Sequence, residues 1–128
     1  MQLTKVETAA APAALGPYSQ AVKAGDFLYC SGQVPLDGET GELVSGGIEE
    51  QSRQSMENLK YVLAAAGIDF NAVVKTTIYL TNLENFAVVN EIYGSFCGAV
   101  APARATVEVS ALPKGALVEI DAVAYLGE

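Results

Sequence analysis

A change of hydrophobic period near the middle of the chain constrains its fold most. Between residues 48 and 66, apolar residues recur at spacings of three and four, which predicts an amphipathic helix ending at Gly67. The runs before and after it are rich in residues typical of strands. A helix of this kind must bury its apolar face, so we expect it to pack against a sheet built from those strands.

The other elements complete an α+β pattern. Asn82 is expected to cap a second helix with one apolar stripe, and the turn pairs Asp37-Gly38 and Thr40-Gly41 predict a hairpin or exposed loop. Without a linker or repeat, residues 1–128 are interpreted as one domain with a mixed sheet of about six strands and both helices on one face. Strands are expected at residues 3–7, 21–24, 26–31, 73–80, 104–109 and 117–126.

Composition excludes several classes of function. Histidine is absent, which removes histidine-based proton shuttles, metal sites and catalytic triads. The net charge of −8 opposes binding to phosphate backbones, so no nucleic-acid partner is expected. Cys30 and Cys97 are far apart and are interpreted as buried small hydrophobes. No apolar run is long enough to cross a membrane, and we expect a soluble, cytoplasmic protein, with an organellar location left open.

Arg104 is one of only two arginines, and it directly follows Ala-Pro-Ala at the head of a strand-like run. If the last two strands pair, Arg104 and Glu119 would project from the same face of the sheet. An exposed ion pair on a solvated sheet is the plainer interpretation of the two charges. A functional site is the other interpretation, because Pro102 fixes how the strand begins and the Val-Glu-Ile-Asp run otherwise suits burial.

Four motifs in order resemble the Rid (YjgF) family of reactive-intermediate deaminases. They are GPYSQA, SGQVP, VKTTIYLTNLENFAVVNEIY and PARATVEVSALPKGALVEI, and together they span nearly the whole chain. The resemblance implies a chorismate-mutase-like fold, a homotrimer and sites between subunits. It also implies hydrolysis of enamines and imines, such as 2-iminobutanoate and 2-iminopropanoate, to 2-keto acids and ammonia, with no cofactor and no metal.

The resemblance also implies roles for particular residues. Arg104 matches the arginine that binds the substrate carboxylate, and Glu119 matches the glutamate that positions water. The remaining substrate-binding residues implied by the match are Tyr18, Ser31, Gly32, Asn90 and Thr106. An arginine fork suits a carboxylate, and an imine needs orientation and one positioned water more than strong acid–base groups.

Some of these residues also have plainer interpretations. Tyr18 could be a packed turn tyrosine, Gly32 could serve a bulge, and Asn90 could be an exposed helix residue. Thr106 replaces a cysteine common in relatives, so a thiol nucleophile is excluded and the main-chain carbonyl at this position would orient the substrate nitrogen. Ala101 replaces a bulky aromatic residue that relatives often have before the proline, and substrate preference is the property we expect this difference to affect most.

Two other functions remain as alternatives. Chorismate-mutase chemistry shares the fold, but its dianionic substrate needs more cationic groups than two arginines and distant lysines provide. The second alternative is a trimeric module that binds small carboxylates, or acts as a chaperone or regulator of translation, without catalysis.

Overall fold

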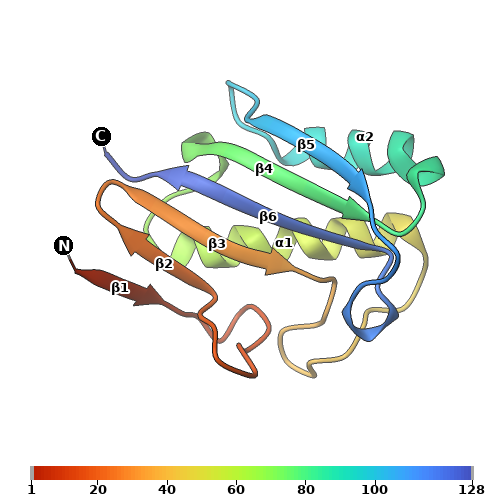
Figure 1. Ribbon diagram of the computed structural model, residues 1–128, viewed down its shortest axis with the longest axis horizontal. Coiled ribbons are helices and arrows are strands. Elements are labelled where there is room, and N and C mark those ends of the chain that lie inside the picture. The colour runs from red at the N-terminus through yellow and green to blue at the C-terminus, as the bar shows by residue number, and fades with distance from the viewer. Residues whose placement is uncertain (1, 128) are drawn as a thin grey trace.

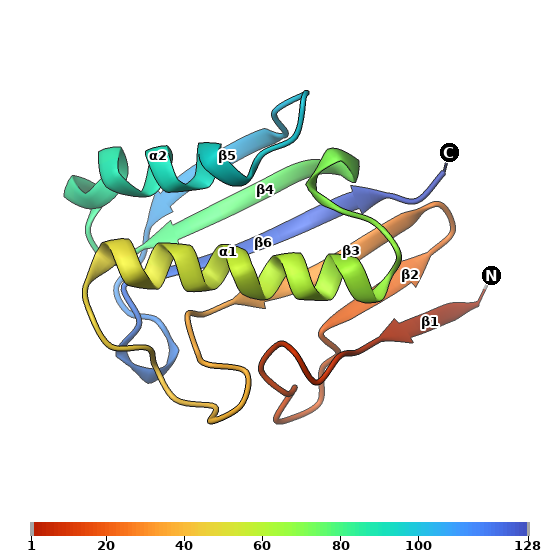
Figure 2. The same ribbon diagram turned by 180° about the vertical axis from the view of Figure 1, so that it is seen from behind.

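The computed structural model describes residues 2–127 as a six-stranded sheet with two helices on one face (Figures 1 and 2). The strand order is β1-β2-β3-β6-β4-β5. The expected mixed sheet with both helices on one face is confirmed. The strands are β1 (Leu3–Val6), β2 (Ala21–Ala24), β3 (Phe27–Gln33), β4 (Val73–Leu80), β5 (Ala103–Glu108) and β6 (Val118–Tyr125), and the helices are α1 (Ile48–Ala65) and α2 (Phe86–Phe96).

The core lies between the sheet and the two helices. Leu59, Val62 and Leu63 of α1 are fully buried, as are Ile78 of β4 and Ile120 of β6. This apolar stripe is the one that the period between residues 48 and 66 predicts. The helix ends as expected, because Gly67 has a φ of +80° and its N–H bonds the carbonyl of Ala64.

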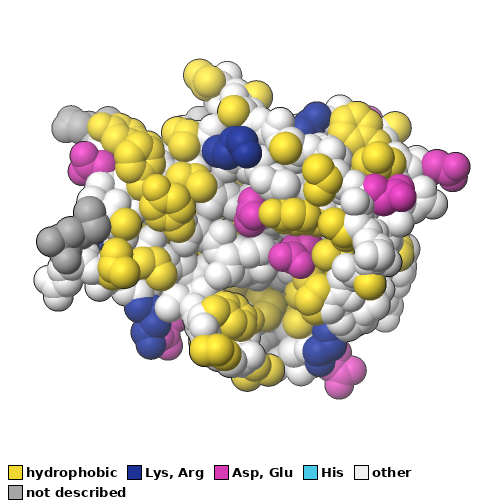
Figure 3. Space-filling view, viewed as in Figure 1, with side chains coloured by type: hydrophobic (Ala, Val, Ile, Leu, Met, Phe, Trp, Pro, Cys, Tyr) yellow, Lys and Arg dark blue, Asp and Glu magenta, His cyan; other side chains and the backbone are white. Residues whose placement is uncertain are grey.

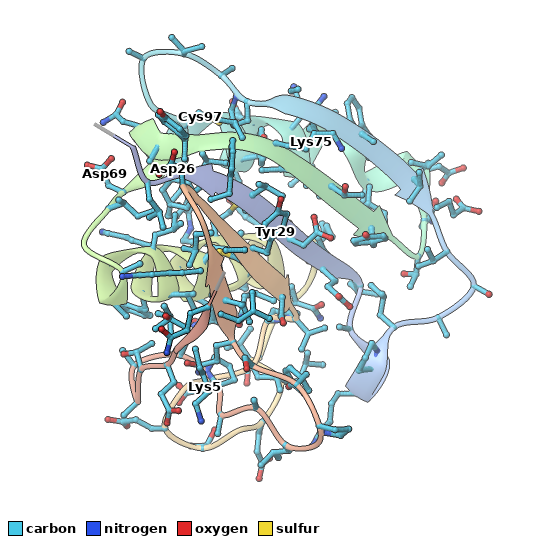
Figure 4. All side chains as sticks on the ribbon, turned by 60° about the vertical axis from the view of Figure 1, so that its left-hand side comes forward. Lys5, Asp26, Tyr29, Asp69, Lys75 and Cys97 are labelled. Carbon is cyan, nitrogen blue, oxygen red and sulfur yellow. The ribbon has the colours of Figure 1, made fainter. Side chains whose placement is uncertain are left out.

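The opposite face of the sheet carries no helix and is partly exposed (Figure 3). Acidic side chains lie near the middle of this face, and hydrophobic side chains gather toward the end near the chain termini. Phe27, Tyr29 and Tyr125 are 38%, 51% and 43% exposed, which is unusual for aromatic residues of one sheet. Tyr29 of β3 and Lys75 of β4 both pair with Val123 of β6, so these three residues form one row across the strands (Figure 4).

The last two strands do not pair with each other, which corrects one expectation from the sequence. Strand β4 lies between them, antiparallel to β6 and parallel to β5. The parallel pair arises because α2 crosses over the sheet between β4 and β5, whereas a tight turn would have produced antiparallel neighbours. Strand β5 is therefore an edge strand.

Within residues 2–127, no helix has the length and apolar character needed to span a membrane. The two cysteines are free, with Cys30 buried and Cys97 half-buried. Burial raises the pKa of the Cys30 thiol to about 12, so it remains protonated and packs as a small hydrophobe, as the sequence indicated.

Candidate functional site

Arg104 and Glu119 project from opposite faces of the sheet. Arg104 pairs with Thr76, which is buried on the helix side, whereas Glu119 pairs with Tyr79 on the open face. The expectation that both side chains share one face is therefore wrong, because it assumed direct pairing of β5 with β6. Within a single chain the two groups form two separate half-sites.

The first half-site holds the guanidinium of Arg104 against α2. Its Nη1 donates a hydrogen bond to Oδ1 of Asn90 at 2.7 Å. Its Cζ lies 5.3 Å from the ring centroid of Phe86 and 5.2 Å from that of Tyr93. These two rings and the amide fix the plane of the guanidinium, which gains a few tenths to about one kcal/mol from each exposed cation–π contact.

The guanidinium keeps free donors for a ligand. Among residues 2–127 no carboxylate forms an ion pair with Arg104, and its one hydrogen bond uses a single nitrogen. The plainer interpretation as a surface ion pair between Arg104 and Glu119 is wrong. An exposed arginine with a fixed plane and unused N–H groups can bind a carboxylate through two parallel hydrogen bonds.

Thr106 lies two residues further along β5, close to the same edge. The N–H of Val109 bonds the carbonyl of Leu80, so alternation along the ladder turns the main-chain groups of Thr106 away from β4. Because β5 is an edge strand, the carbonyl of Thr106 has no strand partner on that side. The Thr106 hydroxyl is itself buried without a hydrogen-bond partner in the described part of the chain.

The second half-site is a cleft beside Glu119 on the open face. Its volume is about 470 Å³, large enough for a small organic acid. Apolar walls come from the loop after β1 and the segment after β3, including Leu15, Val34 and Leu36. Polar groups around the cleft are contributed by Tyr18, Gln20, Ser31, Gly32, Gln33, Lys114 and Glu119.

Glu119 lies directly over Gly32. A Cβ added at Gly32 would overlap the Glu119 carboxylate, so only glycine leaves room for this arrangement. The register between β3 and β6 shifts between Cys30 and Gln33, which places Gly32 within a bulge. Gly32 therefore serves a bulge and also a close approach, and the approaching group is the side chain of Glu119.

The environment of Glu119 makes its carboxylate more basic. Burial raises the pKa of Glu119, and the negative charge of Asp121 raises it further. A carboxylate with a raised pKa accepts a proton from water more readily than an exposed one. The group thus has the character of a general base.

The other residues expected in the site fall into two groups. Tyr18 is 54% exposed and lines the Glu119 cleft, so it is not a packed turn residue. Ser31 lines the same cleft, but its hydroxyl donates to the carbonyl of Ser19 at 2.6 Å and thereby ties the loop before β2 to β3. Asn90 belongs instead to the Arg104 half-site, where it fixes the guanidinium.

Phe86 and Tyr93 were missed as parts of the site. Both belong to the apolar stripe of α2, and a stripe of this spacing is ordinarily core. Tyr93 is 5% exposed and its hydroxyl lies 2.6 Å from Oγ1 of Thr76, so it does contribute to the core. Their second contact, with Arg104, depends on the parallel pairing of β5, which no local pattern in the sequence indicates.

Comparison with known proteins gives consistent matches over nearly the whole chain. Residues 8–126 match the family model described as endoribonuclease L-PSP. The chain is 51% identical over 122 residues to a 2-iminobutanoate/2-iminopropanoate deaminase of Mus musculus, covering 95% of this chain and 90% of the relative.

Two solved structures share the fold. A Rid-family protein of Yersinia pestis has a TM-score of 0.94 and 50% identity, with 97% of this chain and 99% of that chain covered. Escherichia coli TdcF with bound serine has a TM-score of 0.90 and 39% identity, with 95% and 98% covered.

Proposed function

The chain belongs to the Rid (YjgF) family, and from this membership we propose that it hydrolyses 2-imino acids, such as 2-iminobutanoate and 2-iminopropanoate, to 2-keto acids and ammonia. One observation supports this most directly: the guanidinium of Arg104 is fixed by Asn90, Phe86 and Tyr93, yet keeps free donors. A 2-imino acid carries a carboxylate next to its reactive carbon, so such a fork would place that carbon at a defined position. The similarity to the mouse deaminase supports the same substrate class.

In the proposed reaction, Arg104 binds the substrate carboxylate through two charge-assisted hydrogen bonds. The outward main-chain carbonyl of Thr106 accepts a hydrogen bond from the imine N–H and so orients the nitrogen. This uses the backbone rather than a side chain, and threonine at this position is therefore no obstacle. Tyr18 and Ser31 border the space left for the substituent on the imine carbon.

Glu119 supplies the base. Its carboxylate takes a proton from a water molecule while the water oxygen bonds to the imine carbon, and the electron pair of the C=N bond moves to nitrogen, which takes up the proton that Glu119 accepted. The product is a carbinolamine. The proton of its hydroxyl is then transferred through Glu119 to the amino nitrogen as the C–N bond breaks, so that ammonia leaves and the 2-keto acid remains.

We propose further that the protein is a homotrimer with each site formed between two subunits. The separation of Arg104 and Glu119 on opposite faces of one sheet supports this, because one chain alone does not bring the fork to the base. The exposed aromatic residues of the open face also support it, since burial against a second copy would remove Phe27, Tyr29 and Tyr125 from water.

The family model is described as an endoribonuclease, which raises RNA cleavage as a competing activity. A net charge of −8 opposes approach to a phosphate backbone, and the half-sites contain no histidine to shuttle protons. Binding without catalysis is the other alternative, and it predicts affinity for small carboxylates with no turnover.

The test generates 2-iminobutanoate with a threonine dehydratase and follows imine loss spectrophotometrically, with and without this protein. We expect acceleration that is lost in Arg104→Ala and in Glu119→Gln. Acceleration that survives both substitutions would contradict the assigned site, and no acceleration at all would contradict the activity. Parallel incubations with RNA and with chorismate separate the competing functions.

A further inference from the structure

Asp121 is a second carboxylate on the open face, two residues after Glu119 on β6. The register places Asp121 opposite Thr77 and Glu119 opposite Tyr79. Oδ1 of Asp121 accepts the main-chain N–H of Thr77 at 3.0 Å, and Oδ2 accepts the hydroxyl of Tyr79 at 2.9 Å. Both carboxylate oxygens are therefore held by β4, and this orientation of Asp121 is fixed.

The two carboxylates turn toward different neighbouring strands. Asp121 bonds β4, whereas the carboxylate of Glu119 lies over Gly32 in the bulge of β3. Residues at i and i+2 of a strand are roughly 7 Å apart, close enough for two like charges to repel. Repulsion from a fixed Asp121 favours the orientation in which Glu119 points to the bulge and the cleft.

We propose that Asp121, clamped by Tyr79 and Thr77, is a positioning residue for Glu119: it directs the Glu119 carboxylate over Gly32 and favours transfer of a proton to it. This inference rests on the proposed function, in which Glu119 activates water. Asp121 itself does not line the cleft, so its action passes through Glu119.

The electrostatics of the face agree with this geometry. The charge of Asp121 raises the pKa of Glu119, second only to burial. Tyr79 has a raised pKa, first from burial and then from its bond to Asp121, so it remains a hydrogen-bond donor at neutral pH. The titratable groups that surround Glu119 are Asp121 on β6, Tyr79 on β4, and Tyr18 and Lys114 in the cleft, whereas Lys75 lies further along β4, opposite Val123.

The sign of the pH effect follows from these contacts. Glu119 acts as a base only when ionised, so activity is lost as pH falls through its raised pKa. Neutralising Asp121 lowers the pKa of Glu119 and extends activity to lower pH. It also weakens Glu119 as a base, so activity at neutral pH falls.

The test compares Asp121→Asn with the charge-conserving Asp121→Glu, using the full protein. One readout is the pH profile of kcat/KM with 2-iminobutanoate. The second, made without substrate, is the titration of the Glu119 carboxyl by carbon-13 NMR, assigned with Glu119→Gln. Asp121→Thr is a second neutral variant in case Asp121→Asn does not fold, because threonine suits a strand. Glu49→Gln on α1 is the matched control, since it removes one negative charge on the other side of the sheet.

In the neutral variants we expect the ratio of kcat/KM at pH 5 to that at pH 7 to rise roughly threefold or more, with the NMR titration shifted to lower pH. Asp121→Glu should restore most of the wild-type profile, and Glu49→Gln should leave both readouts unchanged. A neutral variant with an unchanged titration, or an unchanged acid limb, overturns the inference. If the wild-type protein does not accelerate imine loss, the proposed function fails, while the NMR titration still decides whether Asp121 acts on Glu119.

Discussion

At the scale of single residues, Arg104 depends on the shape of its side chain as well as on its charge. Lysine in its place would keep a positive charge but lose the planar fork, the bond to Asn90 and the contacts with two rings. We expect Arg104→Lys to lower kcat/KM for 2-iminobutanoate by roughly 100-fold. Arg53→Lys is the matched control, because Arg53 is exposed on α1 and should leave turnover unchanged. Equal activity of both variants would contradict a bidentate role for Arg104.

A substitution at Gly32 tests whether turnover depends on the position of the Glu119 carboxylate. An added methyl group would displace the Glu119 carboxylate from the bulge, so we expect Gly32→Ala to lower kcat roughly 100-fold with little change in the unfolding midpoint. Gly94→Ala on α2 is the control, since its added Cβ meets no atom within 4 Å and alanine favours a helix. A fully active Gly32→Ala enzyme would show that Glu119 works equally well elsewhere.

At the scale of elements, α1 does more than cover the core. Buried Asn58 donates hydrogen bonds to the carbonyls of Val34 and Leu36 at 3.2 and 2.9 Å, and these two residues form part of the cleft wall. Asn58→Ala leaves the carbonyl of Leu36 without a partner and the carbonyl of Val34 with only the N–H of Leu36, so we expect the free energy of unfolding to fall by about 2 kcal/mol, measured by urea denaturation. Lys60→Ala, exposed on the same helix, should change it by less than about 0.5 kcal/mol. Similar midpoints for the two variants would contradict this role of Asn58.

The elements themselves were largely predictable, whereas their partners were not. The period of three and four located α1 to within one residue, and the β-branched run from residue 73 to 80 matched β4. The burial of Asn58 was not predicted, because an asparagine counts as a polar residue in a hydrophobic pattern. Its hydrogen-bond partners lie in the segment after β3, far from α1 in the sequence. Arg104 and Glu119 were expected on one face because their strands were taken as neighbours. The strand order depends instead on the α2 crossover and on contacts between residues distant in sequence, which no local pattern indicates.

At the scale of the whole molecule, the sheet separates Arg104, the proposed carboxylate-binding group, from Glu119, the proposed base. Arg104 is on the side of α2, and Glu119 is on the open face beside Gly32. In the site proposed above, the edge of β5 in one copy meets the cleft of another. The proposed shared site makes activity conditional on assembly, and we expect dilution below the dissociation constant of the assembly to abolish turnover without unfolding the chain.

Mixed assemblies give a direct test of sites shared between subunits. Arg104→Ala and Glu119→Gln chains are each expected to be inactive alone, since every interface lacks one group. When the two are co-refolded in equal amounts, some interfaces join an intact Arg104 from one chain to an intact Glu119 from the next. Random mixing should restore about a quarter of wild-type activity, because each interface needs both intact partners. If both groups acted within one chain, mixing would restore nothing, and Arg104→Ala mixed with Arg104→Ala/Glu119→Gln is the control that should remain inactive.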